Sequence, residues 1–175
     1  MARILIAYST TDGHTARICQ RLGELLAARA HATSVAPLAT VEERDLAACD
    51  KIVIGASIRY GRHSQSVLDF IARNERVLNR KPSAFFSVNV VARKPGKDLP
   101  HTNPYVRKFL ARIAWRPREV GVFAGKIDYP RYGPVDRAII RFIMLLTGGP
   151  IDPKSVVEYT DWGAVEAFAG RVAAL

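Results

Sequence analysis

Five short apolar segments, separated by helical patterns, constrain the fold of this chain more than any other feature of its sequence. None of them shows a clean two-residue alternation of apolar and polar side chains, so both faces of each strand are expected to be covered. Such strands, alternating with helices, predict an α/β fold with a doubly wound, five-stranded parallel sheet. The predicted strands are Arg3–Tyr8, Thr33–Pro37, Lys51–Ser57, Ser83–Val91 and Glu119–Ala124.

Helices are expected between and after these strands. Apolar residues at helical spacing predict one helix over residues 16–30 and another that begins after Ser64 and extends to about Leu78. Shorter helices are predicted for residues 42–48 and 105–114, and the last helix begins at Thr160 or Asp161. A chain of 175 residues is long enough to bury one core, so residues 1–175 are expected to form a single domain.

One segment departs from this alternation. Residues 126–154 form a helical insertion before the last helix, and loops of that length in compact domains usually serve a function. The insertion contains Tyr129-Pro130-Arg131-Tyr132 and a very apolar helix that carries Arg137 and Arg141. Two interpretations remain open: an ordinary buried helix, or an interfacial helix that touches a membrane and holds both arginines near the lipid headgroups.

Positive charge is concentrated in the middle and later part of the chain. The net charge is +10, and residues 51–141 hold 19 Lys and Arg against 6 Asp and Glu. Such a field favours an acidic substrate, a phospholipid surface or a nucleic acid, but no nucleic-acid module is recognisable. No segment reaches the length of a membrane span, and the absence of a signal peptide predicts a cytoplasmic location. Cys19 and Cys49 predict no disulfide framework.

The loop after the first strand predicts a phosphate site. In a doubly wound sheet, ligands bind beyond the carboxyl ends of the strands, and this loop leads directly into a helix. Its hydroxyls, backbone N–H groups and helix N-terminus suit a phosphate dianion, and a glycine lets the backbone wrap closely. A plainer interpretation is that Thr10 or Asp12 only caps the helix. The predicted phosphate residues are Thr10, Thr11, Asp12, Gly13, His14 and Thr15.

Three other phosphate-handling motifs are missing from the sequence. The chain has neither a Gly-x-Gly-x-x-Gly dinucleotide fingerprint nor the Gly-Lys-Ser/Thr of a P-loop. A phosphorelay receiver needs an aspartate at the end of the third strand, where this chain has Ala56-Ser57. The sequence identifies no metal site and no catalytic side chain.

The pattern Tyr8-x-Thr10-x-x-Gly13-x-Thr15 resembles the flavodoxin signature. Longer blocks narrow the resemblance to one bacterial family, the menaquinone-dependent protoporphyrinogen IX dehydrogenases, which are similar to flavodoxin. The resemblance covers nearly the whole chain and implies non-covalently bound FMN and a sheet with the strand order 2-1-3-4-5. The blocks are Ile54–Gly61, Phe85–Pro95, Tyr129–Tyr132 and Tyr159–Trp162.

The resemblance also implies which residues hold the cofactor. The loop of residues 10–15 would hold the FMN phosphate, with His14 where many flavodoxins carry Asn. A second segment would lie along the isoalloxazine, and its Tyr60 is either a stacking residue or a packing aromatic. A third segment would hydrogen-bond the polar edge of the flavin, unless Asn89 only caps a turn. These two segments comprise Ser57, Ile58, Arg59 and Tyr60, and Ser87, Val88, Asn89 and Val90.

The implied reaction is the oxidation of protoporphyrinogen IX to protoporphyrin IX in haem biosynthesis. A membrane quinone, menaquinone or ubiquinone, would accept the electrons, so the resemblance implies a peripheral protein on the cytoplasmic face of the inner membrane. Arg93, Lys94 and Arg131, together with Arg59, are the candidates for the substrate propionates or else solvated surface charges. The alternatives are a flavodoxin-like NAD(P)H:quinone reductase and an electron-carrier flavodoxin, although the latter are typically acidic.

Overall fold

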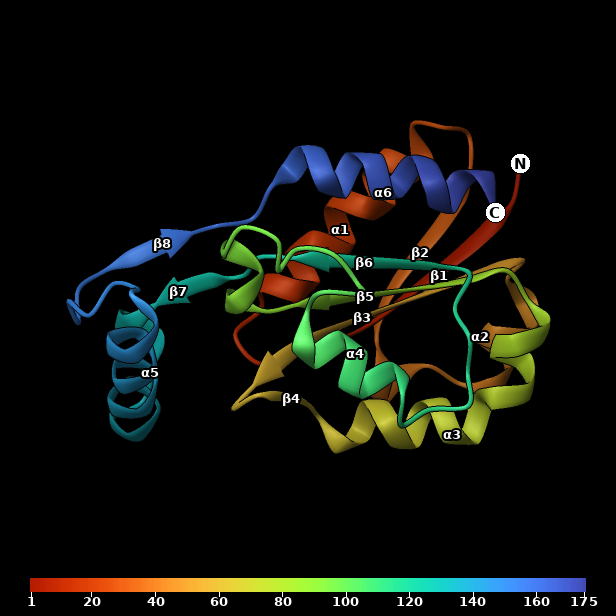
Figure 1. Cartoon of the computed structure of the whole chain (residues 1–175). Coiled ribbons are helices and arrows are strands. Elements are labelled where there is room, and N and C mark those ends of the chain that lie inside the picture. The colour runs from red at the N-terminus through yellow and green to blue at the C-terminus, as the bar shows by residue number, and fades with distance from the viewer.

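The computed structural model describes all residues, 1–175, and has a central parallel sheet (Figure 1). Its five parallel strands follow the order β2-β1-β3-β5-β6, which confirms the predicted order 2-1-3-4-5. Two details differ from the sequence-based expectation, because a two-residue strand, β4, pairs antiparallel with β3 and a separate antiparallel pair joins β7 and β8. The strands of the parallel sheet are β1 (Arg3–Ser9), β2 (Ala32–Pro37), β3 (Lys51–Arg59), β5 (Ser83–Val88) and β6 (Glu119–Phe123).

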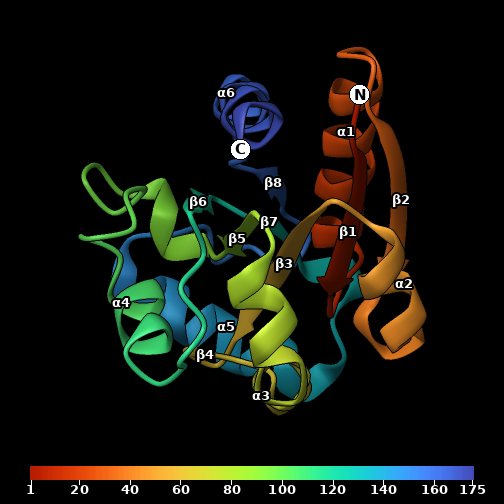
Figure 2. The same ribbon diagram turned by 90° about the vertical axis from the view of Figure 1, so that its right-hand side faces the viewer.

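Helices cover both faces of this sheet (Figures 1 and 2). One face carries α1 (His14–Ala27) and α6 (Trp162–Ala174), and the other carries α2 (Glu43–Ala48), α3 (Gln65–Arg80) and α4 (Pro104–Leu110). Strand β1 shows why the strands lack alternation, since Ile4 and Ile6 pack toward α1 and α6 while Leu5 packs on the other side. Each such buried side chain stabilises the fold by about 2 kcal/mol.

Two element boundaries differ from the prediction for local reasons. The strand predicted to reach Val91 ends at Val88, because the side chain of Asn89 accepts a hydrogen bond from the Ala92 N–H and starts the 3₁₀ turn η2 (Val90–Arg93). The strand predicted to end at Ser57 continues to Arg59, because β4 (Arg62–His63) folds back onto it through a tight turn. Both changes reshape segments at the carboxyl edge of the sheet.

The insertion lies beyond the carboxyl ends of the parallel strands (Figure 1). It leaves the sheet along β7 (Lys126–Asp128), continues through the 3₁₀ turn η3 (Tyr129–Arg131) and α5 (Pro134–Thr147), and returns along β8 (Val156–Glu158). Ile127, Tyr129, Tyr132 and Met144 form its own small core. The pairing of β7 with β8 extends the insertion to Glu158, a few residues past the predicted end.

Helix α5 is not a buried helix, because Met144 is its only buried residue. Phe142, Leu145 and Leu146 remain 60%, 63% and 69% exposed to solvent. The guanidinium group of Arg137 donates to the carbonyls of Tyr129 and Tyr132, and that of Arg141 donates to the carbonyl of Ile151. Both arginines are therefore bonded within the insertion and do not extend away from the protein. No helix of the chain is long and apolar enough to cross a bilayer.

Candidate functional site

A cavity of about 270 Å³ opens at the carboxyl ends of the parallel strands, where doubly wound folds bind ligands. Every residue predicted to contact the cofactor lines this cavity, with the single exception of Ser87. The walls come from the loop before α1, the turn after β3, the segment after β5, and the insertion. Segments far apart in the sequence therefore meet as the sequence predicted, although the role of each residue stays a prediction.

The loop before α1 has the features that a phosphate requires. Gly13 adopts φ = 85°, a left-handed conformation that favours glycine, and no side chain caps the helix that follows. Thr10 accepts from the Gly13 N–H instead, and Asp12 bonds to Arg59, so the plainer interpretation of a capping residue is wrong. The first turn of α1 is thus left with unpaired N–H groups that favour an anion.

Thr15 provides a test of fit for the phosphate. Its side chain is buried, and its hydroxyl is the only buried side-chain oxygen or nitrogen in the chain without a hydrogen-bond partner. A buried hydroxyl that lacks a partner is costly, and such groups are rare in folded proteins. A phosphate at the start of α1 would accept from it, so the residues present fit an FMN phosphate.

His14 connects the same loop to the start of the last helix. Its Nε2 lies 2.6 Å from the Thr160 hydroxyl, which itself donates to the Ala124 carbonyl at 2.7 Å. Because the single hydroxyl proton of Thr160 is used for Ala124, Nε2 of His14 must be the donor. Burial lowers the pKa of His14, which favours the neutral ring. The imidazole thus fastens the phosphate loop to α6, and its Nε2–H is not free for a phosphate.

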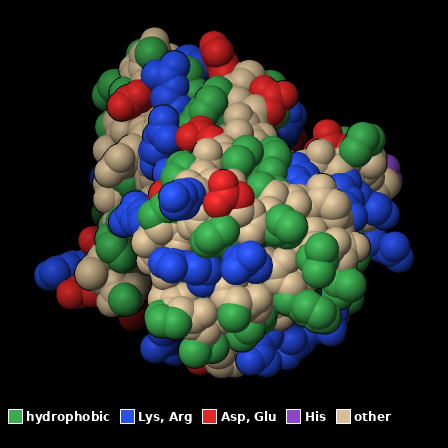
Figure 3. Space-filling view, turned by 90° about the vertical axis from the view of Figure 1, so that its left-hand side faces the viewer, with side chains coloured by type: hydrophobic (Ala, Val, Ile, Leu, Met, Phe, Trp, Pro, Cys, Tyr) green, Lys and Arg blue, Asp and Glu red, His purple; other side chains and the backbone are tan.

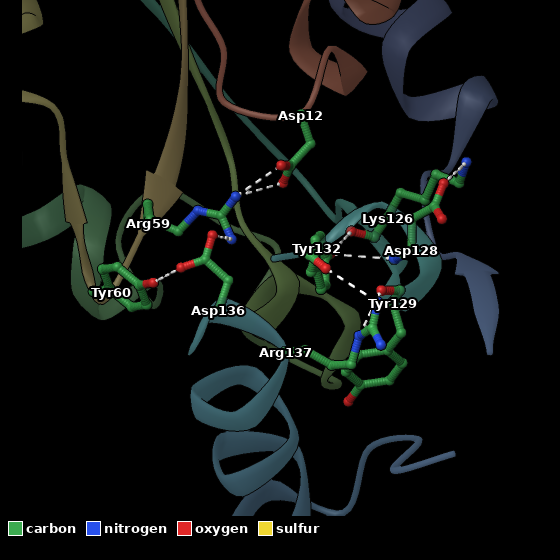
Figure 4. A network of polar contacts seen from close by, with 9 residues as sticks. All are labelled: Asp12, Arg59, Tyr60, Lys126, Asp128, Tyr129, Tyr132, Asp136 and Arg137. Carbon is green, nitrogen blue, oxygen red and sulfur yellow. Dashed lines mark hydrogen bonds and ion pairs between the residues drawn. The ribbon is translucent and has the colours of Figure 1, made fainter. Parts of the chain in front are cut away.

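Arg59 joins the phosphate loop to the insertion (Figure 4). One guanidinium nitrogen lies 2.7 and 2.9 Å from the carboxylate oxygens of Asp12, and the other terminal nitrogen lies 3.9 Å from Asp136 on α5. The Tyr60 hydroxyl also donates to Asp136, and this hydrogen bond raises the pKa of the phenol. Three elements thus meet at one arginine beside the cavity.

Tyr60 and Gly61 form the turn that joins β3 to β4. Both have positive φ, 51° and 77°, as in the two-residue hairpin turns that match the twist of paired strands. A tyrosine with a left-handed backbone conformation costs free energy, so its presence indicates that the surrounding structure constrains this turn. Its side chain is 49% exposed at the cavity, so the alternative of a packed aromatic is not what the structure shows.

The segment after β5 presents backbone to the cavity, while its polar side chains turn inward. The carbonyl oxygen of the Asn89 side chain accepts from the Ala92 N–H and from Asn103, which corresponds to the turn-capping alternative. Ser87 is fully buried and bonds to His63, 2.9 Å away. Neither side chain reaches out to hydrogen-bond a flavin, because each is used to hold the segment in place.

The basic residues predicted to bind the propionates of the substrate fall into two groups. Arg131 lines the cavity, and its guanidinium has no ion-pair or hydrogen-bond partner in the structure. Arg93 and Lys94 do not line it. Arg93 donates to the Val90 carbonyl at 3.0 Å and to Thr147 at 3.2 Å, so it fastens the end of α5 to the segment after β5.

Several cavity residues were not predicted from the sequence. Arg17 lies one helical turn into α1 and pairs with Glu158 at 2.8 Å, and Tyr105 follows the cap of α4. Most of the others belong to the insertion, which the sequence marked by its unusual length and by the block Tyr129–Tyr132. They are Lys126, Ile127, Asp128, Tyr132, Ile140, Ile143 and Met144, together with Gly61, Val91 and Gly125 outside it.

Comparison with known proteins supports the resemblance to flavodoxins that the sequence indicated. Residues 5–154 match the family model described as a flavodoxin domain. The chain is 44% identical over 173 residues to the protoporphyrinogen IX dehydrogenase (quinone) of Escherichia coli K12, covering 99% of this chain and 96% of that protein. It is also 44% identical over 174 residues to the protein of the same name from Leishmania major, covering 99% and 75%.

Solved flavodoxin structures share the fold. An archaeal flavodoxin aligns with a TM-score of 0.51 at 13% identity and covers 97% of this chain and 98% of its own. A flavodoxin from Streptococcus pneumoniae TIGR4 aligns with a TM-score of 0.54 at 15% identity and covers 99% of both chains. At these identities the likeness shows the flavodoxin-like fold alone.

Proposed function

This chain belongs to the flavodoxin-like protoporphyrinogen IX dehydrogenases, and from that membership we propose that it uses FMN to oxidise protoporphyrinogen IX to protoporphyrin IX with a quinone as acceptor. Its relatives are oxidoreductases named for this substrate and for a quinone. We assign the reaction to haem biosynthesis and the acceptor to menaquinone or ubiquinone. Residues 1–175 would act as one domain that includes the insertion.

The observation that carries the FMN proposal is the unpartnered hydroxyl of Thr15 at the uncapped start of α1. Residues 10–15 would hold the phosphate, and the segments 57–60 and 88–90 would flank the ring system. When bound there, FMN supplies a two-electron acceptor that the side chains of this chain do not provide. The protein supplies binding, orientation and electrostatics around it.

The charges around the cavity suit two anionic groups, the FMN phosphate and a propionate of the substrate. Arg59 neutralises Asp12, which would otherwise place a carboxylate beside the phosphate dianion. Arg131 is the cavity-lining cation whose guanidinium remains available, so we assign it to a substrate propionate. Lys126 and Arg17 also line the cavity, but each is already paired, with Asp128 and Glu158 respectively.

We further infer that the outer face of α5 rests on an anionic bilayer, where a quinone is dissolved. Four apolar residues of this face are each at least 60% exposed: Val135, Phe142, Leu145 and Leu146. Single exposed apolar residues are common on protein surfaces, whereas a continuous exposed apolar face is uncommon. On the surface that faces away from the sheet, Lys and Arg side chains lie beside apolar ones (Figure 3). The same helix lines the cavity with Ile140, Ile143 and Met144. The protein would thus be peripheral, on the cytoplasmic face of the inner membrane.

Anaerobic spectroscopy tests this function directly. The FMN-loaded protein should lose its yellow absorbance when protoporphyrinogen IX is added and regain it when a menaquinone or ubiquinone analogue follows. Reduction by NADPH but not by protoporphyrinogen IX would establish the alternative, an NAD(P)H:quinone reductase. Protein that binds no FMN at all would exclude both functions.

A further inference from the structure

A continuous chain of buried polar side chains lies behind the cavity. Ser87 on β5 is 2.9 Å from Nε2 of His63 and 3.2 Å from the amide nitrogen of Asn89, and Asn89 is 3.0 Å from Asn103. All four residues are at most 6% exposed. Buried polar groups are kept only where they are satisfied, so a chain of four invites an explanation beyond packing.

The direction of each hydrogen bond follows from fixed donors. The carbonyl oxygen of Asn89 is identified because the Ala92 N–H donates to it, so the Asn89 amide nitrogen must donate to Ser87. The Ser87 hydroxyl has no hydrogen-bond partner other than Asn89 and His63, so its proton goes to Nε2 of His63, which accepts it. Burial lowers the pKa of His63 to about 4, and this agrees with a neutral ring that accepts.

The chain joins the two segments that would flank the flavin ring. At one end, His63 belongs to β4, the returning strand of the hairpin that holds Tyr60 at positive φ beside the cavity. At the other end, Asn89 begins η2, whose residues Val90 and Val91 also line the cavity. Asn103 adds the start of α4, because its side chain caps that helix next to the cavity residue Tyr105.

We propose that Ser87, His63 and Asn89 are positioning residues that hold the Tyr60 hairpin and the segment 88–91 at a fixed separation and thereby set the affinity and reduction potential of the flavin. None of the three side chains contacts the flavin itself in this role. Their effect passes through the backbone of the two segments they connect. The proposal rests on the FMN binding proposed above, and it also makes a claim about the protein without FMN.

Ser87→Ala is the central variant, because it removes the hydroxyl to which both His63 and Asn89 bond. Ser83→Ala is the matched control: Ser83 is equally buried on the same strand, and its hydroxyl also makes two hydrogen bonds, with Leu78 and Trp115, at the end of β5 away from the cavity. His63→Gln is the conservative variant, because a glutamine oxygen can still accept from Ser87, whereas His63→Leu cannot.

Three measurements separate positioning from stability alone. Ser87→Ala removes two buried hydrogen bonds and His63→Leu removes one. We expect each variant to weaken FMN binding about tenfold, because the two segments are then held less firmly, and to shift the two-electron midpoint potential. His63→Gln should restore both values. In the apoprotein, Ser87→Ala should speed amide hydrogen exchange in residues 60–63 and in 88–92 together, while Ser83→Ala changes neither segment.

Equal weakening of FMN binding by Ser83→Ala and Ser87→Ala would overturn the proposal, as would an unchanged midpoint potential in Ser87→Ala. Faster exchange confined to one of the two segments would also contradict it, because the chain would then not connect them. If the unaltered protein binds no FMN, the proposed function fails. The exchange measurement on the apoprotein would still report whether the chain links the segments.

Discussion

One guanidinium nitrogen of Arg59 lies within 2.9 Å of both carboxylate oxygens of Asp12, and so joins the end of β3 to the phosphate loop. Without Arg59, the carboxylate would face the FMN phosphate unpaired. We therefore expect Arg59→Gln to weaken FMN binding about tenfold. The double variant Asp12→Asn with Arg59→Gln should recover most of that loss, as titration of the apoprotein with FMN would show. Arg44→Gln, which breaks an exposed pair with Glu42, serves as the control.

Thr15→Val separates cofactor binding from stability. Valine has nearly the shape of threonine but no hydroxyl, and the hydroxyl of Thr15 has no partner within the protein. The apoprotein should therefore keep its stability or gain roughly 1 kcal/mol, while its affinity for FMN falls. Urea unfolding of the apoprotein and FMN titration measure the two effects. A destabilised apoprotein with unchanged FMN affinity would remove Thr15 from the phosphate site.

His63 makes stability depend on pH in the acid range. The unfolded chain takes up a proton at His63 near pH 6.5, whereas the folded chain does so only near pH 4, because burial depresses the pKa. Unfolding is then coupled to proton uptake between these two pH values. The contribution of His63 to the free energy of unfolding is fully present above pH 6.5 and is lost as the pH falls toward 4. The expected loss by pH 4 is ~3 kcal/mol. His63→Gln should flatten this part of the curve in urea titrations at several pH values, and an unchanged slope would count against it.

Arg131 should affect the substrate and not the cofactor. Arg131→Gln removes the unpaired cavity-lining guanidinium, so we expect the KM for protoporphyrinogen IX to rise about tenfold. FMN affinity should stay the same. Lys94→Gln is the comparison, because Lys94 lies outside the cavity lining and should raise KM less. Steady-state kinetics with an equal rise for both variants would instead indicate a general effect of positive charge.

The outer face of α5 should carry the affinity for membranes. Replacing both Leu145 and Leu146 by Ser removes two apolar side chains that are 63% and 69% exposed. Binding to vesicles of phosphatidylglycerol and phosphatidylethanolamine should fall at least tenfold, with FMN affinity preserved. Val35→Ser on the edge strand β2 alters another exposed apolar residue and should leave vesicle binding unchanged. Co-sedimentation that is unaffected by the double variant would exclude α5 as the contact.

The sequence predicted the sheet well because its signal is local. Successive side chains of β1, such as Leu5 and Ile6, enter opposite cores, and this requires apolar residues at every position. The pairing of β7 with β8 was missed because each strand has only three residues and its partner lies about thirty residues away. No local pattern reports such a pairing.

The site was predictable as a set of segments but not as a set of contacts. The loop, the turn after β3 and the segment after β5 meet because carboxyl ends of parallel strands share an edge. Where Asn89 and Arg93 point depends on partners such as Asn103 and Thr147, which are distant in sequence. A basic residue near a cavity therefore looks the same in the sequence whether it binds a ligand or fastens a helix.

The β7–β8 pair also determines how the insertion is attached to the rest of the fold. Lys126 faces Glu158 across this ladder, so the insertion leaves the sheet and returns at nearly the same place. Its buried side chains pack mainly with one another, in the small core around Tyr129 and Met144. The insertion therefore shapes one wall of the cavity with its own residues without adding a strand to the parallel sheet.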